Sequence, residues 1–178
     1  MAVIEYVLDY VAMLESMIPE HAGESTSIPD EIVSEPGIYL VVNGRDAYVG
    51  VSKDVRKRFQ QRQGACFELC IPRGALKGAH AYVGFVRYRN HGAAAWEYER
   101  RYNGNRTTIF LDGHRYDYEH MLIRAFPEMH PDTQMTNSRK TYFLKNRGRY
   151  PIEIKFVPFP DTESEENKSY KLKAGGKL

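Results

Sequence analysis

The chain has 178 residues, of which 42% are hydrophobic and 27% charged, values typical of one globular domain. No stretch approaches the roughly 18 to 20 apolar residues of a membrane helix, and the N-terminal run lacks the positively charged start of a signal peptide. These features exclude the membrane and secreted classes. We expect a cytoplasmic protein that has no membrane partner.

The net charge of +2 conceals an uneven distribution along the chain. Residues 1–37 contain eight acidic residues and no Lys or Arg, whereas residues 158–178 are neutral. Residues 38–157 therefore carry a net charge of +10. The excess of basic residues over 38–157, after an acidic N-terminal segment, indicates a polyanionic partner.

The N-terminal segment has a helical pattern of apolar residues. They recur every three or four positions from Val3 to Leu14, with acidic residues between them. This spacing predicts an amphipathic helix over residues 3–17. Together with the polar, proline-containing stretch that follows, it predicts a helical arm over residues 1–35.

A β-hairpin is predicted next. The apolar runs 38–42 and 47–51 are separated by Asn43-Gly44-Arg45-Asp46, and an Asn-Gly pair tolerates the positive φ angles of a tight turn. Ser52 can cap a following helix that extends from Lys53 to about Gln63.

The remaining sequence predicts five further elements. They are a strand over His80–Arg89, a short helix over Ala93–Arg101, a strand over Thr107–Leu111 with a turn at Asp112-Gly113, a helix over Asp117–Phe126 that ends at Pro127, and a strand over Pro151–Val157. Residues 161–178 have few apolar side chains and predict a flexible tail. We expect an α+β fold, with a small central antiparallel sheet flanked by helices, in one domain over residues 1–160.

The hairpin and the segments after it contain five elements of one motif. Gly37-Ile38-Tyr39 is followed by Tyr48-Val49-Gly50, and Arg58 lies in a basic helix. Glu119 comes later in an apolar helix, and Asn137 follows a proline-containing loop. Five elements in a fixed order are far more specific than any single triplet.

This order resembles the signature of the GIY-YIG nuclease family, over roughly residues 36–140. The spacing from Pro36 to Phe59 is similar to that of the bacterial excision-repair incision subunit. The resemblance implies a GIY-YIG-like core and Mg²⁺-dependent (or Mn²⁺-dependent) hydrolysis of DNA phosphodiester bonds.

Phosphodiester hydrolysis needs an activated water, positive charge near the phosphate, and assistance to the leaving oxygen. The resemblance implies that Tyr39 takes a proton from the attacking water and that Tyr48 positions the water or the phosphate. A free phenol has a pKa near 10, so this role requires nearby metal and arginine charge. Gly50 has no side chain and would let a phosphate approach the backbone.

The other motif residues have chemistry that suits a phosphate and a metal. Arg58 presents a fork of donors that matches two phosphate oxygens. The resemblance implies that Glu119 is the metal ligand, and a single carboxylate with waters and phosphate oxygens is a common way to hold Mg²⁺. Asn137 would orient Tyr39 or the substrate backbone.

The chain departs from the family pattern at three places. Arg62 stands where many members have Tyr or His, and Val51 stands where the repair branch has Lys. The 61 positions from Arg58 to Glu119 exceed what a compact core needs, which indicates an insertion over roughly residues 88–115.

This insertion is the best candidate for substrate recognition, because arginines alternate in it with aromatic residues such as Trp96 and Tyr98. A second basic cluster follows Asn137 and would extend the track of phosphate contacts. The predicted DNA-binding residues are Arg56, Lys57, Arg62, Arg87, Arg89, Arg100, Arg101, Arg106, Arg139 and Lys140.

Ordinary structural roles compete with these assignments. Tyr39 and Tyr48 could be half-buried sheet residues, and Glu119 could pair with a neighbouring arginine. His114 and His120 are six residues apart across a predicted turn-to-helix junction, which favours solvent or hydrogen-bonding roles over metal binding.

A single domain with a built-in basic insertion is similar to the small restriction enzymes of this family. The resemblance therefore implies a sequence-specific type II restriction endonuclease, acting on double-stranded DNA as a homodimer or higher homo-oligomer. A phage, mobile-element or structure-specific repair nuclease is the alternative. A catalytically silent nucleic-acid-binding module is a second alternative.

Overall fold

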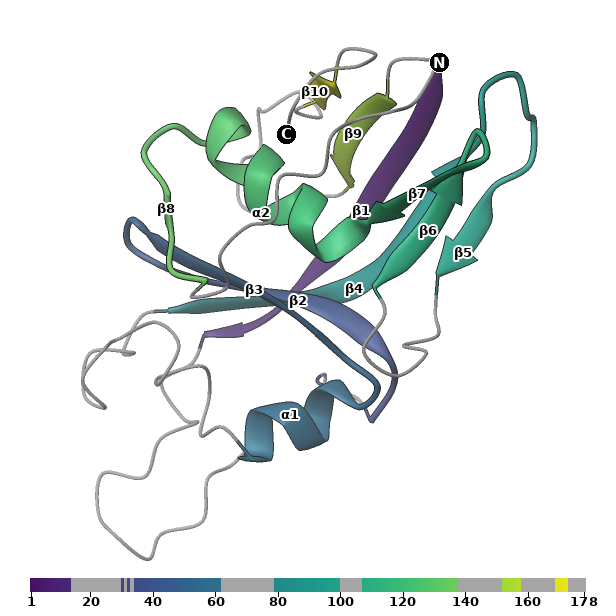
Figure 1. Ribbon diagram of the computed structural model, residues 1–178. Helices are drawn as coiled ribbons and strands as arrows, with labels where there is room; N and C mark the ends of the chain where they lie inside the picture. The colour runs from purple at the N-terminus through teal and green to yellow at the C-terminus, as the bar shows by residue number, and fades with distance from the viewer. Residues whose placement is uncertain are drawn as a thin grey trace, which may run out of the picture.

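The computed structural model describes residues 1–13, 30, 32, 34–61, 79–99, 107–137, 152–157 and 169–172, and every structural statement below concerns these residues. They form an α+β fold in which strands predominate (Figure 1). Its elements are β1 (Ala2–Met13), β2 (Gly37–Asn43), β3 (Asp46–Ser52), α1 (Val55–Gln61), β4 (His80–Arg89), β5 (Glu97–Glu99), β6 (Thr108–Leu111), β7 (His114–Asp117), α2 (Tyr118–Met129), β8 (Gln134–Met135), β9 (Ile152–Val157) and β10 (Ser169–Leu172). Neither described helix is long and apolar enough to cross a membrane.

Most of the described strands belong to one curled sheet with the order β10-β9-β1-β4-β2-β3-β8, and β5 is also paired with β4. The pairs β1–β9 and β3–β8 are parallel, and the others are antiparallel. The centre of the sheet, β4-β2-β3, matches the predicted small antiparallel sheet. The whole sheet is larger and mixed, because β1, β9 and β10 extend it beyond β4 and β8 extends it beyond β3.

The predicted N-terminal helix is wrong. Residues 2–13 form β1, which lies between β9 and β4 and pairs with β4 from Val3↔Arg89 to Met13↔His80. Residues 2–6 and Leu8 are buried, as expected for a strand that is covered on both faces. Because β-branched and aromatic residues suit a strand with partners on both sides, pairing overrides the weak helical periodicity. The segment is therefore part of the core and not an arm.

Three smaller predictions also need correction. Residues 97–99 form β5 instead of a helix, since β2 covers only part of one edge of β4 and β5 satisfies the backbone groups beyond it. The helix α2 continues past Pro127 to Met129, whose buried side chain holds the last turn against the core. Within the predicted flexible tail, residues 169–172 form β10 and pair with β9.

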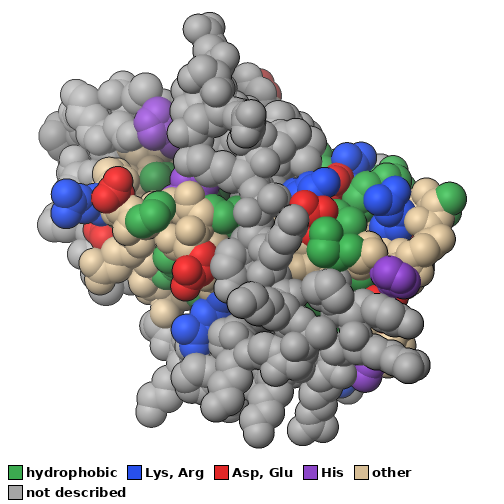
Figure 2. Space-filling view, turned by 90° about the horizontal axis from the view of Figure 1, so that it is seen from above, with side chains coloured by type: hydrophobic (Ala, Val, Ile, Leu, Met, Phe, Trp, Pro, Cys, Tyr) green, Lys and Arg blue, Asp and Glu red, His purple; other side chains and the backbone are tan. Residues whose placement is uncertain are grey.

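The two helices lie on opposite sides of the sheet (Figure 1). Side chains alternate along each strand, so Leu40 and Val49 face α2 whereas Tyr39 and Tyr48 face the side of α1. Seen from the α2 side, the described acidic and basic side chains are interspersed (Figure 2). No single-sign patch forms in the described part of that view.

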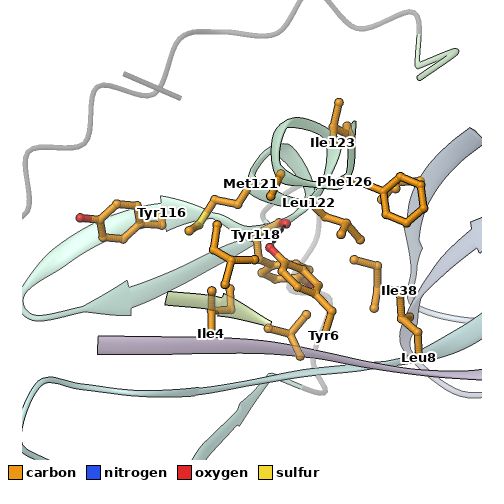
Figure 3. Close-up of a cluster of buried hydrophobic side chains, with 14 of the residues drawn as sticks. Ile4, Tyr6, Leu8, Ile38, Tyr116, Tyr118, Met121, Leu122, Ile123 and Phe126 are labelled. Carbon is orange, nitrogen blue, oxygen red and sulfur yellow. Dashed lines mark hydrogen bonds between the residues drawn. The ribbon is translucent and has the colours of Figure 1, made fainter. Parts of the chain in front are cut away.

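The main core lies between α2 and the sheet. Buried side chains from α2 point toward the strands and meet side chains of β1 and β2 (Figure 3). The Tyr6 hydroxyl donates a hydrogen bond of 2.7 Å to the backbone oxygen of Tyr118, which ties β1 to the start of α2. This helix begins at Asp117, whose carboxylate accepts from the backbone N–H of His120.

Candidate functional site

Tyr39 and Tyr48 lie next to each other on one face of the β2–β3 hairpin. The register pairs Tyr39 with Gly50 and Val41 with Tyr48, so the two tyrosines are diagonal neighbours. Their ring centroids are 6.2 Å apart with an interplanar angle of 35°. Both side chains are buried, with 3% and 8% of their surface exposed. The hairpin therefore brings the two predicted site tyrosines together.

Gly50 makes room for the Tyr39 ring. A Cβ atom at this position would clash with the Cζ and Oη atoms of Tyr39. The space above Gly50 is thus filled by the phenol and is not open to a phosphate, which corrects the expectation from the sequence. The missing side chain sets the position of the Tyr39 hydroxyl.

Two side chains of the helix α1 contact Tyr39. Arg58 Nε donates to Tyr39 Oη at 3.5 Å, and the Phe59 ring packs edge-on against the tyrosine ring at 5.2 Å. Asp54 caps this helix, since its Oδ1 accepts from the N–H of Lys57 at 2.8 Å. The cap is two residues later than the Ser52 predicted from the sequence.

The side chain of Asn137 forms hydrogen bonds with the backbone of β3. Its Oδ1 accepts from the N–H of Val49 at 3.1 Å, and its Nδ2 donates to the Val49 oxygen at 2.7 Å. This side chain continues the pairing that β8 begins on β3. Asn137 therefore fixes the strand between Tyr48 and Gly50, and the role predicted from the sequence, orienting Tyr39 or the substrate backbone, stays a prediction.

Glu119 lies apart from the tyrosine pair. It is in the first turn of α2, with 7% of its surface exposed, and this helix packs on the face of the sheet opposite Tyr39. The preceding residue, Tyr118, lines a small hollow with Gly37, Val51 and Phe85. The helix thus begins beside the point where β2 starts, but the fold does not place Glu119 on the tyrosine face.

In the described part of the chain, no group of three or more His, Cys, Asp or Glu side chains is arranged to hold a metal ion. His120 Nδ1 lies 3.5 Å from Asp117 Oδ2, within the first turn of α2.

The predicted DNA-binding arginines that are described differ in their surroundings. Arg56 donates to the backbone oxygen of Ile32 at 3.0 Å and lies 3.6 Å from Asp30. Arg87 and Arg89 lie against the ring of Trp96, at 4.7 and 4.9 Å from its centroid. Lys57 is exposed on α1. The residues outside the described part are Arg62, Arg100, Arg101, Arg106, Arg139 and Lys140.

The sequence pattern did not predict the ion-pair partner of Arg87. Its Nε lies 2.5 Å from a carboxylate oxygen of Glu5, which is buried on β1. A strand pattern over residues 2–8 would have paired these side chains across β1 and β4. The acidic residue nearest the N-terminus therefore offsets one of the basic charges.

Comparison with known proteins adds no relative, because no protein-family model, curated protein or solved structure matches the chain.

Proposed function

We propose that the chain is a Mg²⁺-dependent DNA endonuclease of the GIY-YIG type, most simply a sequence-specific type II restriction enzyme. One observation carries the proposal: Tyr39, Tyr48 and Arg58 come together on one face of the β2–β3–α1 unit, with Arg58 in contact with the Tyr39 hydroxyl. These are three of the five motif residues, supplied by three successive elements.

The geometry suits the first step of phosphodiester hydrolysis. The guanidinium of Arg58 has several N–H donors, so one can hold Tyr39 while others face a phosphate. In this proposal, Tyr39 takes part as its phenolate, which receives the proton of the attacking water and becomes the neutral phenol, and Tyr48 positions that water. Since the Tyr39 ring is buried and Arg58 is only partly buried, the phosphate would enter from the side of Arg58.

Glu119 is the proposed metal ligand. A carboxylate with waters and phosphate oxygens fits the chemistry of Mg²⁺, which would offset the charge that develops on the phosphate and the leaving oxygen. This part of the proposal is supported by the order of the motif alone, because α2 packs on the opposite face from Tyr39.

Double-stranded DNA is the proposed substrate, and a homodimer is the proposed active form. The net charge of +10 over residues 38–157 suits a polyanion. Two copies related by a twofold axis would place one site on each strand of a palindromic sequence.

The separation of Glu119 from Tyr39 favours one alternative. A chain that keeps the tyrosine and arginine cluster but does not place a metal beside it would bind nucleic acid without cutting it. Such a module would show steeply salt-dependent DNA binding and no cleavage with any divalent metal.

The test is digestion of supercoiled plasmid by the purified full chain with Mg²⁺. We expect discrete fragments, and loss of cutting in Tyr39→Phe and in Glu119→Gln. Two matched controls should cut normally: Tyr82→Phe, a buried tyrosine on the α2 side of β4, and Glu128→Gln, an exposed carboxylate on α2. Absence of cutting by the wild type, or full activity of Tyr39→Phe and Glu119→Gln, would contradict the proposal.

A further inference from the structure

One edge of β4 is shared by two strands. β2 pairs with His80–Gly84, and β5 pairs with Val86–Tyr88. Because Tyr39 is opposite Val83, alternation along β4 places Phe85, Arg87 and Arg89 on the tyrosine face of the sheet. This face therefore continues from the proposed site along β4.

The continuation carries an exposed aromatic ring. Tyr98, opposite Arg87 on β5, has 50% of its surface exposed, and its ring packs against Phe85 at 5.9 Å. Trp96 precedes β5 and contacts the guanidinium groups of Arg87 and Arg89. Large aromatic side chains this exposed are uncommon in the described part of the chain, where Phe110 is the other example.

The two arginines have different electrostatic partners. Arg87 is held by the buried Glu5 carboxylate, which offsets its charge. Arg89 has no acidic partner among the described residues, and its contact is the Trp96 ring. A guanidinium that stacks on an indole keeps its N–H donors at its edge, where they can bind an anion. Arg89 is thus the cation available to a phosphate, and Arg87 is a positioning residue.

We propose that Tyr98, Trp96 and Arg89 form a stacking platform for an unpaired nucleotide of the DNA strand. The base stacks on Tyr98, and the adjacent phosphate is bound by Arg89. A paired duplex presents phosphates but keeps its base faces inside the stack, so an exposed aromatic beside a cation suits an unpaired strand.

The platform deepens the proposed function, and it rests on that function for the claim that the strand continues toward Tyr39. It adds to the proposed double-stranded substrate a segment that is already unpaired, and a nucleotide of this segment stacks on Tyr98. The Glu5–Arg87 pair and the Phe85 ring support the platform from β1 and β4.

Trp96 is the single tryptophan of the chain and reports directly on the platform. The full chain is titrated in EDTA, without a divalent metal, with a single-stranded DNA of about 12 nucleotides and with the same sequence as a duplex. We expect the single strand to quench Trp96 fluorescence and to bind more tightly than the duplex. Fluorescence anisotropy of a labelled strand gives the affinities of the variants.

Matched variants test whether binding depends on the platform residues or on any exposed aromatic or basic side chain. Tyr98→Ala should weaken single-strand binding about tenfold or more, and Tyr98→Phe should bind within about twofold of the wild type. Phe110→Ala removes an aromatic that is 61% exposed on the separate β6–β7 pair, and it should leave the affinity unchanged. Arg89→Ala should lower the salt dependence by about one phosphate contact, whereas Arg115→Ala, an exposed arginine on β7, should not.

The inference is overturned if the duplex binds as tightly as the single strand, or if Tyr98→Ala binds like Phe110→Ala, in variants whose thermal unfolding is unchanged. Tyr98-dependent binding by a chain that never cuts DNA would support the platform and contradict only the nuclease. Plasmid cutting together with binding that is indifferent to Tyr98 would contradict only the platform.

Discussion

The phenol of Tyr39 lies directly over Gly50, in the space that a side chain would otherwise fill. Gly50 is thus needed to accommodate the ring of Tyr39, because the two residues face each other across β2 and β3. Their contact sets the distance between the Tyr39 hydroxyl and Arg58.

Gly50→Ala should displace the Tyr39 ring and lower the free energy of unfolding by about 1 to 3 kcal/mol, because the added methyl overpacks the hairpin face. In a Tyr39→Ala background the same change should cost almost nothing, since the clashing atoms are gone. Urea denaturation of the four proteins of this cycle measures the coupling. Equal costs in both backgrounds would show that the ring and the glycine do not interact.

Asn137→Ala should lower the free energy of unfolding by about 1 to 3 kcal/mol, because the backbone N–H and oxygen of Val49 both lose a partner. Asn137→Asp keeps an acceptor for the N–H but places a carboxylate oxygen against the Val49 oxygen, so it should also be destabilising. Hydrogen exchange at the Val49 amide should accelerate in Asn137→Ala. Unchanged exchange there would refute the pairing.

Arg87→Met should lower the free energy of unfolding by about 2 to 3 kcal/mol, because it leaves the buried Glu5 carboxylate without its partner. The double variant Glu5→Gln/Arg87→Met should recover most of this loss. Chemical denaturation of the single and double variants measures the difference. A double variant as unstable as Arg87→Met would mean that the ion pair is not what holds Arg87.

Burial raises the pKa of the Tyr6 phenol well above its ordinary value of about 10. The folded protein then keeps this proton at pH values where the unfolded chain loses it, so the free energy of unfolding should fall as the pH rises above about 10. Tyr6→Phe should reduce this alkaline slope, at a cost of about 1 kcal/mol near neutral pH from the lost hydrogen bond to Tyr118.

A second buried tyrosine provides a further check. Burial also raises the pKa of Tyr88 to about 12, so Tyr88→Phe should reduce the slope between pH 10 and about 12. Thermal unfolding measured from pH 8 upward decides the point. An identical slope in wild type and Tyr6→Phe would contradict the assignment.

The sequence predicted the elements with strong local signals. The Asn-Gly turn marked the β2–β3 hairpin, and the apolar run 80–89 has the same bounds as β4. The N-terminal strand was mistaken for a helix, because its placement between β9 and β4 depends on partners at least 67 residues away in the chain (Met13↔His80). Short strands such as β5 and β10 carry no periodicity of their own and form because a neighbouring strand has an open edge.

The site, too, could be predicted only in part from the sequence. Sequence order indicated Tyr39, Tyr48 and Arg58, which the hairpin and α1 bring together. It could not show that the Tyr39 ring fills the space above Gly50, or that α2 would place Glu119 on the other face, since both depend on the register of paired strands and on the packing of α2. These are three-dimensional relations that spacing does not encode.

The central claim is that Tyr39 performs chemistry on DNA, and one plasmid digest with Mg²⁺ tests it most directly. Tyr39→Phe keeps the ring over Gly50 but removes the hydroxyl beside Arg58. The proposal predicts that its cleavage rate falls by about a hundredfold or more, while Tyr82→Phe cuts at the wild-type rate. Equal rates for Tyr39→Phe and the wild type would contradict it.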